Sequence, residues 1–319
     1  MDVATLSFPE LFTFSFGLSA TYDAQSSFSD VLTYGGSGTD WLGYDDGQRS
    51  LPDALADPSA EVPGQVEARD ITLTNEERLA AAEESQRLTE AFSQDWALGQ
   101  ETVPFNQSVS LSLGGPATFL GGQLGYTGSF NYGRSFSWFP DATNAAWVLA
   151  ASRFGDPGDI TATDRLNNGT IYSNDLAAFE AVDFDSLDAA LFRNTRSVEE
   201  VNWGGSGTVS YRPVRNHEFG LTMLRTQSGA KEALDLGGIN IQSSTRALRS
   251  QAQGYTERSL SSVQLRGEHL FGVLRAEWKG ALSNNQQDEP DLRLFTFGSN
   301  RVVNDEGVID TTFALTGAG

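Results

Sequence analysis

The stretch from Phe12 to Tyr22 reads FTFSFGLSATY and alternates between two kinds of side chain. Apolar or aromatic residues occupy every second position, and the residues between them are small and mostly polar. Side chains of a β-strand point alternately to the two faces of a sheet, so this stretch predicts a strand with one apolar and one polar face. Such a strand suits a transmembrane β-barrel, whose outer face contacts lipid while its lumen holds water.

The same alternation returns in six later stretches of the chain. In the last of them the charged residues Arg275, Glu277 and Lys279 all fall on the face opposite Trp278. In the stretch before it, Leu260 is out of phase with the following apolar residues, and we expect a β-bulge near Ser261 or Ser262 to restore the phase. The predicted strands are 106–113, 124–138, 197–212, 218–227, 255–270 and 274–283.

The connections between the predicted strands alternate between long and short, as in outer-membrane barrels, which have long loops outside and short turns on the periplasmic side. The long connections would then be extracellular: 23–104, 140–196, 230–253 and the residues beyond Asn284. The first of them contains a predicted helix from Thr74 to Trp96, because Thr74 and Glu77 have the spacing of a capping box. Aromatic residues near strand ends would form interfacial girdles: Tyr22, Trp138, Tyr211 and Trp278.

Composition narrows the class of protein. The formal charge of -21 disfavours binding to nucleic acid, which depends on Lys and Arg. The mean hydropathy of -0.31 and the lack of a run of about 18 apolar residues exclude a bundle of membrane helices. The chain has no cysteine, so disulfides and thiolate metal sites are excluded. The same composition also suits a secreted, soluble β protein, and composition alone favours that alternative.

The two ends of the chain carry expectations of their own. Met1 is followed directly by Asp2, with no basic region and no apolar region of a signal peptide. A barrel has to be exported, so we expect the natural beginning to be missing. Residues 313–319 contain no predicted terminal strand, which suggests that this end is also cut.

An ordered series of segments resembles the barrel portion of TonB-dependent outer-membrane receptors. The segments that carry the resemblance are 8–12, 32–47, 106–107, 255–269 and 288–291. The resemblance implies an all-β, antiparallel transmembrane barrel of 22 strands filled by a plug domain. The chain would supply about seven of these strands, with long extracellular loops and one loop helix. Residues 1–11 would be the plug-to-barrel junction and residues 12–319 an incomplete barrel, lacking the plug and the C-terminal strands.

The resemblance also implies a function, a location and partners. It implies an energy-coupled receptor of the cell outer membrane that takes up a large, scarce nutrient, such as an iron chelate, cobalamin or an oligosaccharide. Its partners would be outer-membrane lipid, the plug domain, the periplasmic TonB protein and the cargo. We expect no enzyme activity and no cofactor. The alternative is a soluble secreted β protein that binds carbohydrate or surfaces through Trp and Tyr.

Several residues could suggest a chemical site. Asp45, Asp46 and Gly47, near Asp40, allow a calcium loop, but they lack the spacing of an EF-hand and favour a solvated turn. His217 and His269 are the only histidines, and both lie in or beside predicted turns, which argues against zinc binding or a paired catalytic role. We therefore predict no catalytic, metal or cofactor residue and assign no ligand-binding residue.

Other motifs favour structural roles. The Gly-rich pieces 34–38 and 204–207 do not continue as phosphate-binding loops, and the second suits contact with a plug. The triplets that begin at Asn106 and Asn168 match the glycosylation pattern, which occurs by chance in a chain rich in Ser and Thr. The charged residues that would point inward favour contacts with the plug or the lumen: Arg212, Arg266, Arg275, Glu277 and Lys279.

Overall fold

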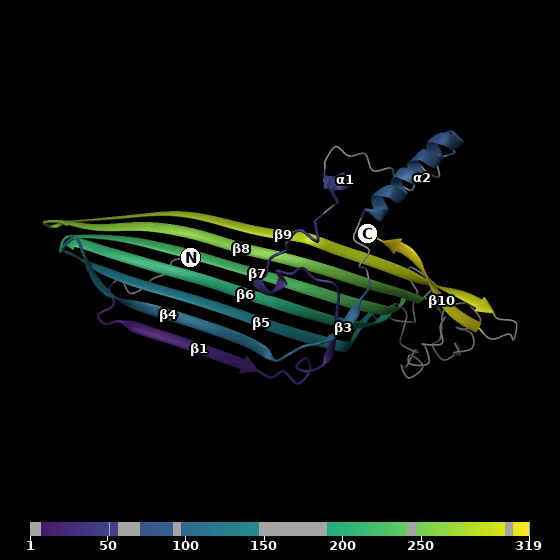
Figure 1. The fold of residues 1–319 in the computed structure, drawn as a ribbon, viewed down its shortest axis with the longest axis horizontal. Coiled ribbons are helices and arrows are strands. Elements are labelled where there is room, and N and C mark those ends of the chain that lie inside the picture. The colour runs from purple at the N-terminus through teal and green to yellow at the C-terminus, as the bar shows by residue number, and fades with distance from the viewer. Residues whose placement is uncertain are drawn as a thin grey trace, which may run out of the picture.

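A computed structural model describes residues 8–50, 52–56, 71–91, 97–146, 190–240, 247–303 and 309–318. Most of them form one eight-stranded antiparallel sheet in the order β1-β4-β5-β6-β7-β8-β9-β10 (Figure 1). Its strands are β1 Thr13–Thr21, β4 Asn106–Phe119, β5 Gly122–Ala146, β6 Ala190–Val214, β7 His217–Asn240, β8 Ala247–Phe271, β9 Leu274–Val303 and β10 Ile309–Ala318. The prediction of an all-β, antiparallel protein is confirmed at this level.

Smaller elements lie between β1 and β4 in the chain. A separate two-stranded sheet pairs β2 with β3, and the helices are short except for one. These elements are β2 Asp30–Thr33, the 3₁₀ helix η1 Asp40–Leu42, α1 Asp53–Ala56, α2 Asn75–Glu90 and β3 Gly99–Thr102. The predicted loop helix corresponds to α2, and its capping box is formed: the Thr74 amide donates to Glu77 Oε2 (2.8 Å) and the Glu77 amide to Thr74 Oγ1 (3.3 Å).

Two-residue turns join β4 to β5, β6 to β7 and β8 to β9, and all three lie at the same end of the sheet (Figure 1). In the first turn both Leu120 (φ 46°) and Gly121 (φ 79°) have positive φ, as a type I′ turn requires. This turn type matches the right-handed twist of the strands it joins. The tight hairpins therefore fix the register in which neighbouring strands pair.

All seven predicted strands are strands of the large sheet, but several are longer than predicted. β7 continues to Asn240 and β8 begins at Ala247, where the sequence predicted a connection over 230–253. β9 continues to Val303, although we expected a long connection after Asn284. The alternation is weak in these extensions: residues 284–289 of β9 are all polar, and in β7 the polar side chain of Lys231 lies on the apolar face. The short strands β2 and β3 were not predicted, and neither was β10, which lies where we expected a strandless chain end.

The predicted β-bulge near Ser261 is wrong. Leu260 pairs in regular register with Thr226 and Asn285, and its side chain lies on the polar face. The register shift in this strand pair lies instead between Tyr255 and Glu257. The apparent phase error is therefore a leucine that points to the polar face of the sheet.

Two small apolar clusters lie between the β2–β3 sheet and the large sheet. One joins Val31 and Val103 to Phe136 of β5, which is only 5% exposed, and the other joins Leu32 and Tyr34 to Ala233 of β7. Trp138 packs against both clusters. The sequence predicted it as a girdle residue near a strand end, but it lies within β5 and contacts protein. The β2–β3 sheet is thereby fixed on one face of the large sheet.

Candidate functional site

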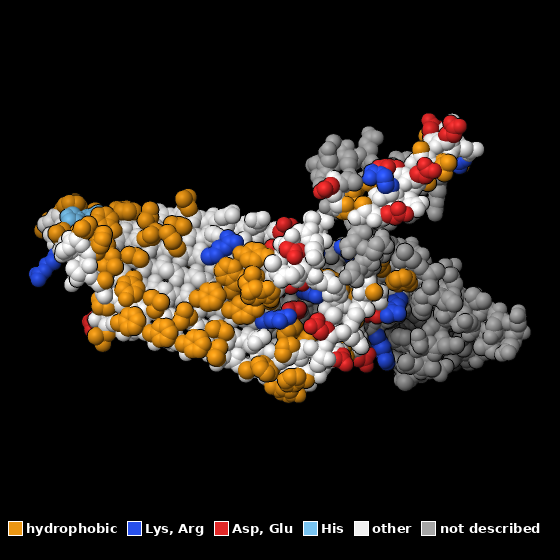
Figure 2. Space-filling view, in the orientation of Figure 1, with side chains coloured by type: hydrophobic (Ala, Val, Ile, Leu, Met, Phe, Trp, Pro, Cys, Tyr) orange, Lys and Arg blue, Asp and Glu red, His pale blue; other side chains and the backbone are white. Residues whose placement is uncertain are grey.

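One face of the large sheet carries an apolar band that crosses seven strands. The strand pairing brings the apolar residues of each strand side by side, for example Phe16 with Leu111 and Leu111 with Phe130. Figure 2 shows these side chains gathered over the part of the sheet toward the two-residue turns. Members of the band include Phe14, Phe16, Leu18, Val109, Leu111, Leu113, Leu124, Tyr126, Phe130, Val209, Tyr211, Phe219, Leu221, Met223, Val263, Leu265, Trp278 and Leu282.

The apolar band is open to the surroundings. Phe14 is 62% exposed, Leu18 71% and Leu282 81%. On β4, β5, β8 and β9 the band extends over 109–119, 124–132, 263–271 and 274–282, which is nine to eleven residues per strand. Exposed apolar surfaces of this extent mark interaction sites in folded proteins.

The border of the band on the side away from the turns runs obliquely across the sheet. On β1 this border lies at Leu18. The strand pairing leads from Leu18 to Gln286 in β9, but the last apolar residue of the band in β9 is Leu282, four residues nearer to the turns. The residues between, in order of pairing, are Val109, Tyr132, Trp203, Gln227 and Ser259.

The border near the turns is shifted in the same direction. Phe12 lies beside Gly115, from which the pairing leads to Gly280 in β9. The band in β9 extends to Leu274, six residues nearer to the turns. With about 3.4 Å per residue and about 4.8 Å between strands, a shift of about five residues over six strand-to-strand steps corresponds to an inclination of about 30°. This angle is measured from the perpendicular of the strands, so the strands are tilted by about 30° from the normal of the band.

The opposite face of the sheet is polar. Directly paired hydroxyl side chains form hydrogen bonds across it: Ser129 with Ser206 (2.7 Å), Thr208 with Thr222 (3.1 Å) and Ser262 with Ser283 (2.9 Å). Small hydroxyl residues that bond one another in this way suit a face that contacts water or another polar surface.

Near the turns, the polar face carries a cluster of charged residues. Glu218 accepts hydrogen bonds from Arg212 (2.7 Å) and Arg266 (3.3 Å), and the Phe8 ring lies 4.2 Å from the Arg212 guanidinium carbon. The other residues predicted to point inward also lie on this face. Arg275 pairs with Glu268 and Glu277, and Lys279 lies opposite Arg266 in the register.

Residues 30–50, which we call the docked segment, lie on the apolar face beyond the band. Four hydrogen bonds fix its backbone or side chains to four strands. Tyr132 donates to Trp41 O (2.9 Å), Trp203 Nε1 to Leu42 O (2.8 Å), Gln227 to Gly43 O (2.7 Å) and Tyr34 Oη to Gly254 O (2.7 Å). The strands β5, β6 and β7 thus continue beyond the band, and polar side chains on these parts of the strands bind the docked segment.

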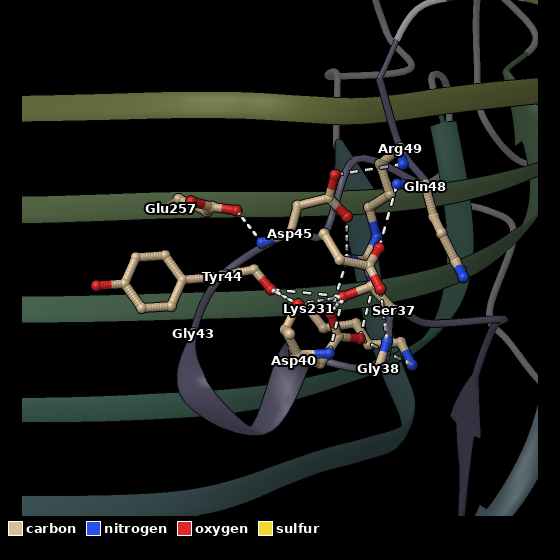
Figure 3. A network of polar contacts seen from close by, with 12 residues as sticks. Ser37, Gly38, Asp40, Gly43, Tyr44, Asp45, Gln48, Arg49, Lys231 and Glu257 are labelled. Carbon is tan, nitrogen blue, oxygen red and sulfur yellow. Dashed lines mark hydrogen bonds and ion pairs between the residues drawn. The ribbon is translucent and has the colours of Figure 1, made fainter.

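Arg49 is the centre of a buried ion network between the docked segment and the sheet (Figure 3). Its guanidinium donates to both Asp40 oxygens (2.7 Å each) and to Asp45 (3.0 Å), and its carbon lies 4.1 Å from the centre of the Tyr255 ring. The side chain is only 4% exposed. Burial lowers the Arg49 pKa, but the hydrogen bonds and charges of Asp40 and the charge of Asp45 outweigh this and leave the pKa raised. The arginine is therefore held in its charged form.

Asp45 and Asp46 differ in their surroundings: Asp45 belongs to the Arg49 network, whereas Asp46 lies in an exposed turn with Gly47 and Gln48. Asp45 binds Arg49 and accepts a hydrogen bond from the Gly47 amide (2.9 Å), while Asp46 accepts from Gly38 (3.2 Å) and Gln48 (3.2 Å). The Arg49 guanidinium balances the charges of Asp40 and Asp45. In the described residues no group of three or more His, Cys, Asp or Glu side chains is placed to hold a metal ion.

Two other ionisable groups touch this network. Burial lowers the pKa of Lys231, whose ammonium lies 4.0 Å from Asp40, although the charges of Glu199 and Asp40 oppose that change. Burial raises the pKa of Glu257, and the hydrogen bond from the Asp45 amide lowers it by less. The negative charges of Asp45 and Asp288 raise it further.

The Glu257 pKa predicts a dependence of docking on pH. Because the pKa of Glu257 is raised in the folded state, its protonated form favours docking. This stabilisation is complete below the ordinary glutamate pKa and is lost as the pH rises through the raised value. Glu257→Gln keeps an oxygen for the Asp45 amide but removes the charge. We expect the variant to melt at a higher temperature than the parent at neutral pH, with the difference vanishing in acid. Near-ultraviolet circular dichroism during heating measures the melting temperatures of the variant and the parent at each pH. A difference in melting temperature that is the same at every pH would contradict this role of Glu257.

Gly229 of β7 is required where the docked segment approaches the sheet. A Cβ at this position would lie 2.4 Å from Tyr255 Oη and 2.6 Å from Gly43 Cα. We expect Gly229→Ala to weaken docking by about 1–3 kcal/mol through overpacking. The matched control is Gly237→Ala on the same strand, where an added Cβ would have no atom within 4 Å. Protease cleavage of the docked segment should accelerate in the first variant only.

His217 and His269 are direct partners in the pairing of β7 with β8. Their Nδ1 atoms are 3.0 Å apart, and Trp278 Nε1 donates to His269 Nε2 at 3.0 Å. The sequence placed both histidines beside turns without predicting that they pair. The signal was available, because His217 begins β7 and His269 lies two residues before the end of β8, and these two ends adjoin in neighbouring antiparallel strands.

The remaining motifs have structural positions. Residues 204–207 lie in the middle of β6, as predicted, with Gly204 and Ser206 on the polar face and Gly205 and Gly207 on the apolar face. Asn106 begins β4, and its Oδ1 accepts a hydrogen bond from the Phe136 amide (2.8 Å). The triplet at Asn168 lies outside the described residues.

Comparisons of the chain with protein-family models, with curated proteins and with solved structures gave no match. In the part of the chain that the structure describes, no helix has the length and apolar character needed to cross a membrane.

Proposed function

We propose that the large sheet spans a membrane, with the apolar band in contact with lipid and the polar face bordering an aqueous space. The oblique band carries this proposal. Transmembrane β-strands need about 9–11 residues to cross the hydrocarbon core and are tilted by about 35–45°. The band has nine to eleven residues on four of its strands, and its borders are inclined by about 30° to the perpendicular of the strands, so the strands are tilted by about 30° from the normal of the band.

The alternative, a soluble β protein, needs a second protein layer over the band. The layer that the described residues provide is the β2–β3 sheet with the docked segment, and it covers the extensions of the strands beyond the band. A soluble sandwich also has no reason to hold its apolar surface at a constant length on tilted strands. These observations favour lipid as the occupant of the band.

The transport role extends the proposal. We propose that the sheet is part of an outer-membrane receptor for energy-coupled uptake of a large nutrient, as the resemblance to TonB-dependent receptors implies. The hydroxyl-lined polar face would then border the barrel interior and contact water or a plug domain. The cargo and the residues that bind it are not assigned.

Single cysteines test which face contacts lipid, and the chain has no native cysteine to remove. The pair Leu265→Cys and Gln264→Cys places a polarity-sensitive dye on the apolar or the polar face of one strand. In phospholipid vesicles we expect dye at 265 to emit at shorter wavelength and to be quenched by brominated lipid, and dye at 264 to be quenched by iodide. If position 265 is equally protected without lipid, the soluble alternative is correct.

A further inference from the structure

The border of the apolar band carries an unusual arginine. Arg225 follows Met223 of the band on the same face of β7 and precedes Gln227, which binds the docked segment. Its side chain is exposed. Arg49 and Arg134, on the same face, each form an ion pair, whereas no carboxylate among the described residues lies within ion-pair distance of Arg225.

Hydroxyl groups from two elements converge on this guanidinium. Nη1 of Arg225 donates to Ser261 Oγ of β8 (2.5 Å), and Nη2 lies 3.5 Å from Tyr44 Oη of the docked segment. Figure 3 shows the Tyr44 ring directed away from the ion network around Arg49. On the other side, Arg225 pairs with Gly205, where even an added Cβ would meet nothing closer than 3.7 Å. The guanidinium therefore stands beside open surface.

The position of Tyr44 is fixed by its neighbours. Its ring centre lies 6.2 Å from that of Trp203, which donates to Leu42 O, and the next residue, Asp45, belongs to the Arg49 network. Trp41, which is 54% exposed, lies in the same turn of the docked segment. Aromatic side chains with a polar atom are enriched where a bilayer meets water, because one end is apolar and the other can bind water or headgroups.

We infer that Arg225, Tyr44 and Ser261 bind the phosphate of a membrane lipid headgroup at the border of the apolar band; this inference rests on the proposed membrane function. A guanidinium presents parallel N–H donors that match two phosphate oxygens, and the two hydroxyl groups can donate to the others. A lipid held there would lay its acyl chains along Met223, Val263 and Leu282 of the band. A free phosphate would satisfy the same donors but would not use the band.

Native mass spectrometry of the full chain in dodecyl maltoside, titrated with phosphatidylglycerol, tests the site. We expect Arg225→Gln to weaken binding of one lipid about tenfold, as the loss of one charge-assisted contact predicts. Arg225→Lys should bind with intermediate strength, because the charge is kept and the fork is lost. The matched control is Arg258→Gln, an exposed arginine on the opposite face of β8, which should bind like the parent.

The other outcomes overturn the inference in distinguishable ways. Equal binding by the parent and Arg225→Gln, or equal binding of a phosphate-free galactolipid, would show that the site does not recognise lipid phosphate. Competition by inorganic phosphate at the lipid concentration would assign the site to phosphate from solution. If the cysteine pair at 264 and 265 fails its own test in vesicles, the membrane proposal fails; if that test succeeds, only the Arg225 site is rejected.

Discussion

Arg49→Met should release the docked segment from the sheet. The substitution fills a similar volume but leaves the buried Asp45 without its cation and Asp40 with only the Lys231 ammonium at 4.0 Å. Removal of one partner from a buried ion pair costs about 3–5 kcal/mol, because an uncompensated charge remains in a medium of low polarity. Amide hydrogen exchange of residues 40–49 measures the effect as a fall of that size in the free energy of local opening.

An exposed arginine provides the control for this prediction. Arg87→Met in α2 removes an ion pair with Glu84, three residues earlier in the same helix, in which both side chains are largely exposed. Pairs of this kind contribute at most about 1 kcal/mol. Exchange of residues 40–49 should be unchanged in this variant. An equal effect of the two substitutions would show that the Arg49 network does not hold the segment.

Leu265→Arg should strongly destabilise the protein in a membrane. Leu265 lies inside the apolar band, paired with Leu221 on one side and Gly280 on the other. An arginine on the lipid face of a barrel costs about 2–4 kcal/mol near the middle of the bilayer and less near an interface. Denaturant unfolding of the chain in phospholipid vesicles measures this loss. Trp278→Arg, also in the band, should be destabilising in the same assay.

The neighbouring residue supplies the control for the membrane face. Gln264→Arg places the same charge on the polar face, where Gln264 pairs with Thr222 and Ala281. We expect it to change the free energy of unfolding by less than about 1 kcal/mol, because the new side chain remains in water. Lys279→Trp tests the same face by replacing a charged side chain with an aromatic one, and severe destabilisation by this variant would also show that the faces are reversed. If Gln264→Arg is the more damaging of the two arginine variants, the assignment of the faces is reversed.

The alternation of side chains made the sheet predictable where one of its faces is apolar and the other polar. Phe14, Phe16 and Leu18 repeat every second residue and so lie on one face. The outer half of β7 was missed for the opposite reason. In β7, Gln227 and Lys231 point to the apolar face, but they contact the docked segment, so that face contains polar residues there.

The docked segment depends on contacts between residues far apart in the sequence, and local patterns contain little trace of them. Asp45 and Glu257 are joined by a hydrogen bond across more than two hundred residues, and Arg49 packs on Tyr255. The sequence analysis grouped Asp40, Asp45 and Asp46, but it considered only a calcium ion or water as their partner. The one local clue was Arg49 itself, a single cation four residues after Asp45.

The histidine pair has a defined arrangement of protons. The indole nitrogen of Trp278 can only donate, so the Nε2 atom of His269 that receives it carries no hydrogen in the neutral ring. The hydrogen of His269 is then on Nδ1 and is donated to Nδ1 of His217, which leaves the hydrogen of His217 on Nε2. One tryptophan on β9 thereby selects opposite tautomers for two imidazoles on β8 and β7, a directional order that runs across three strands.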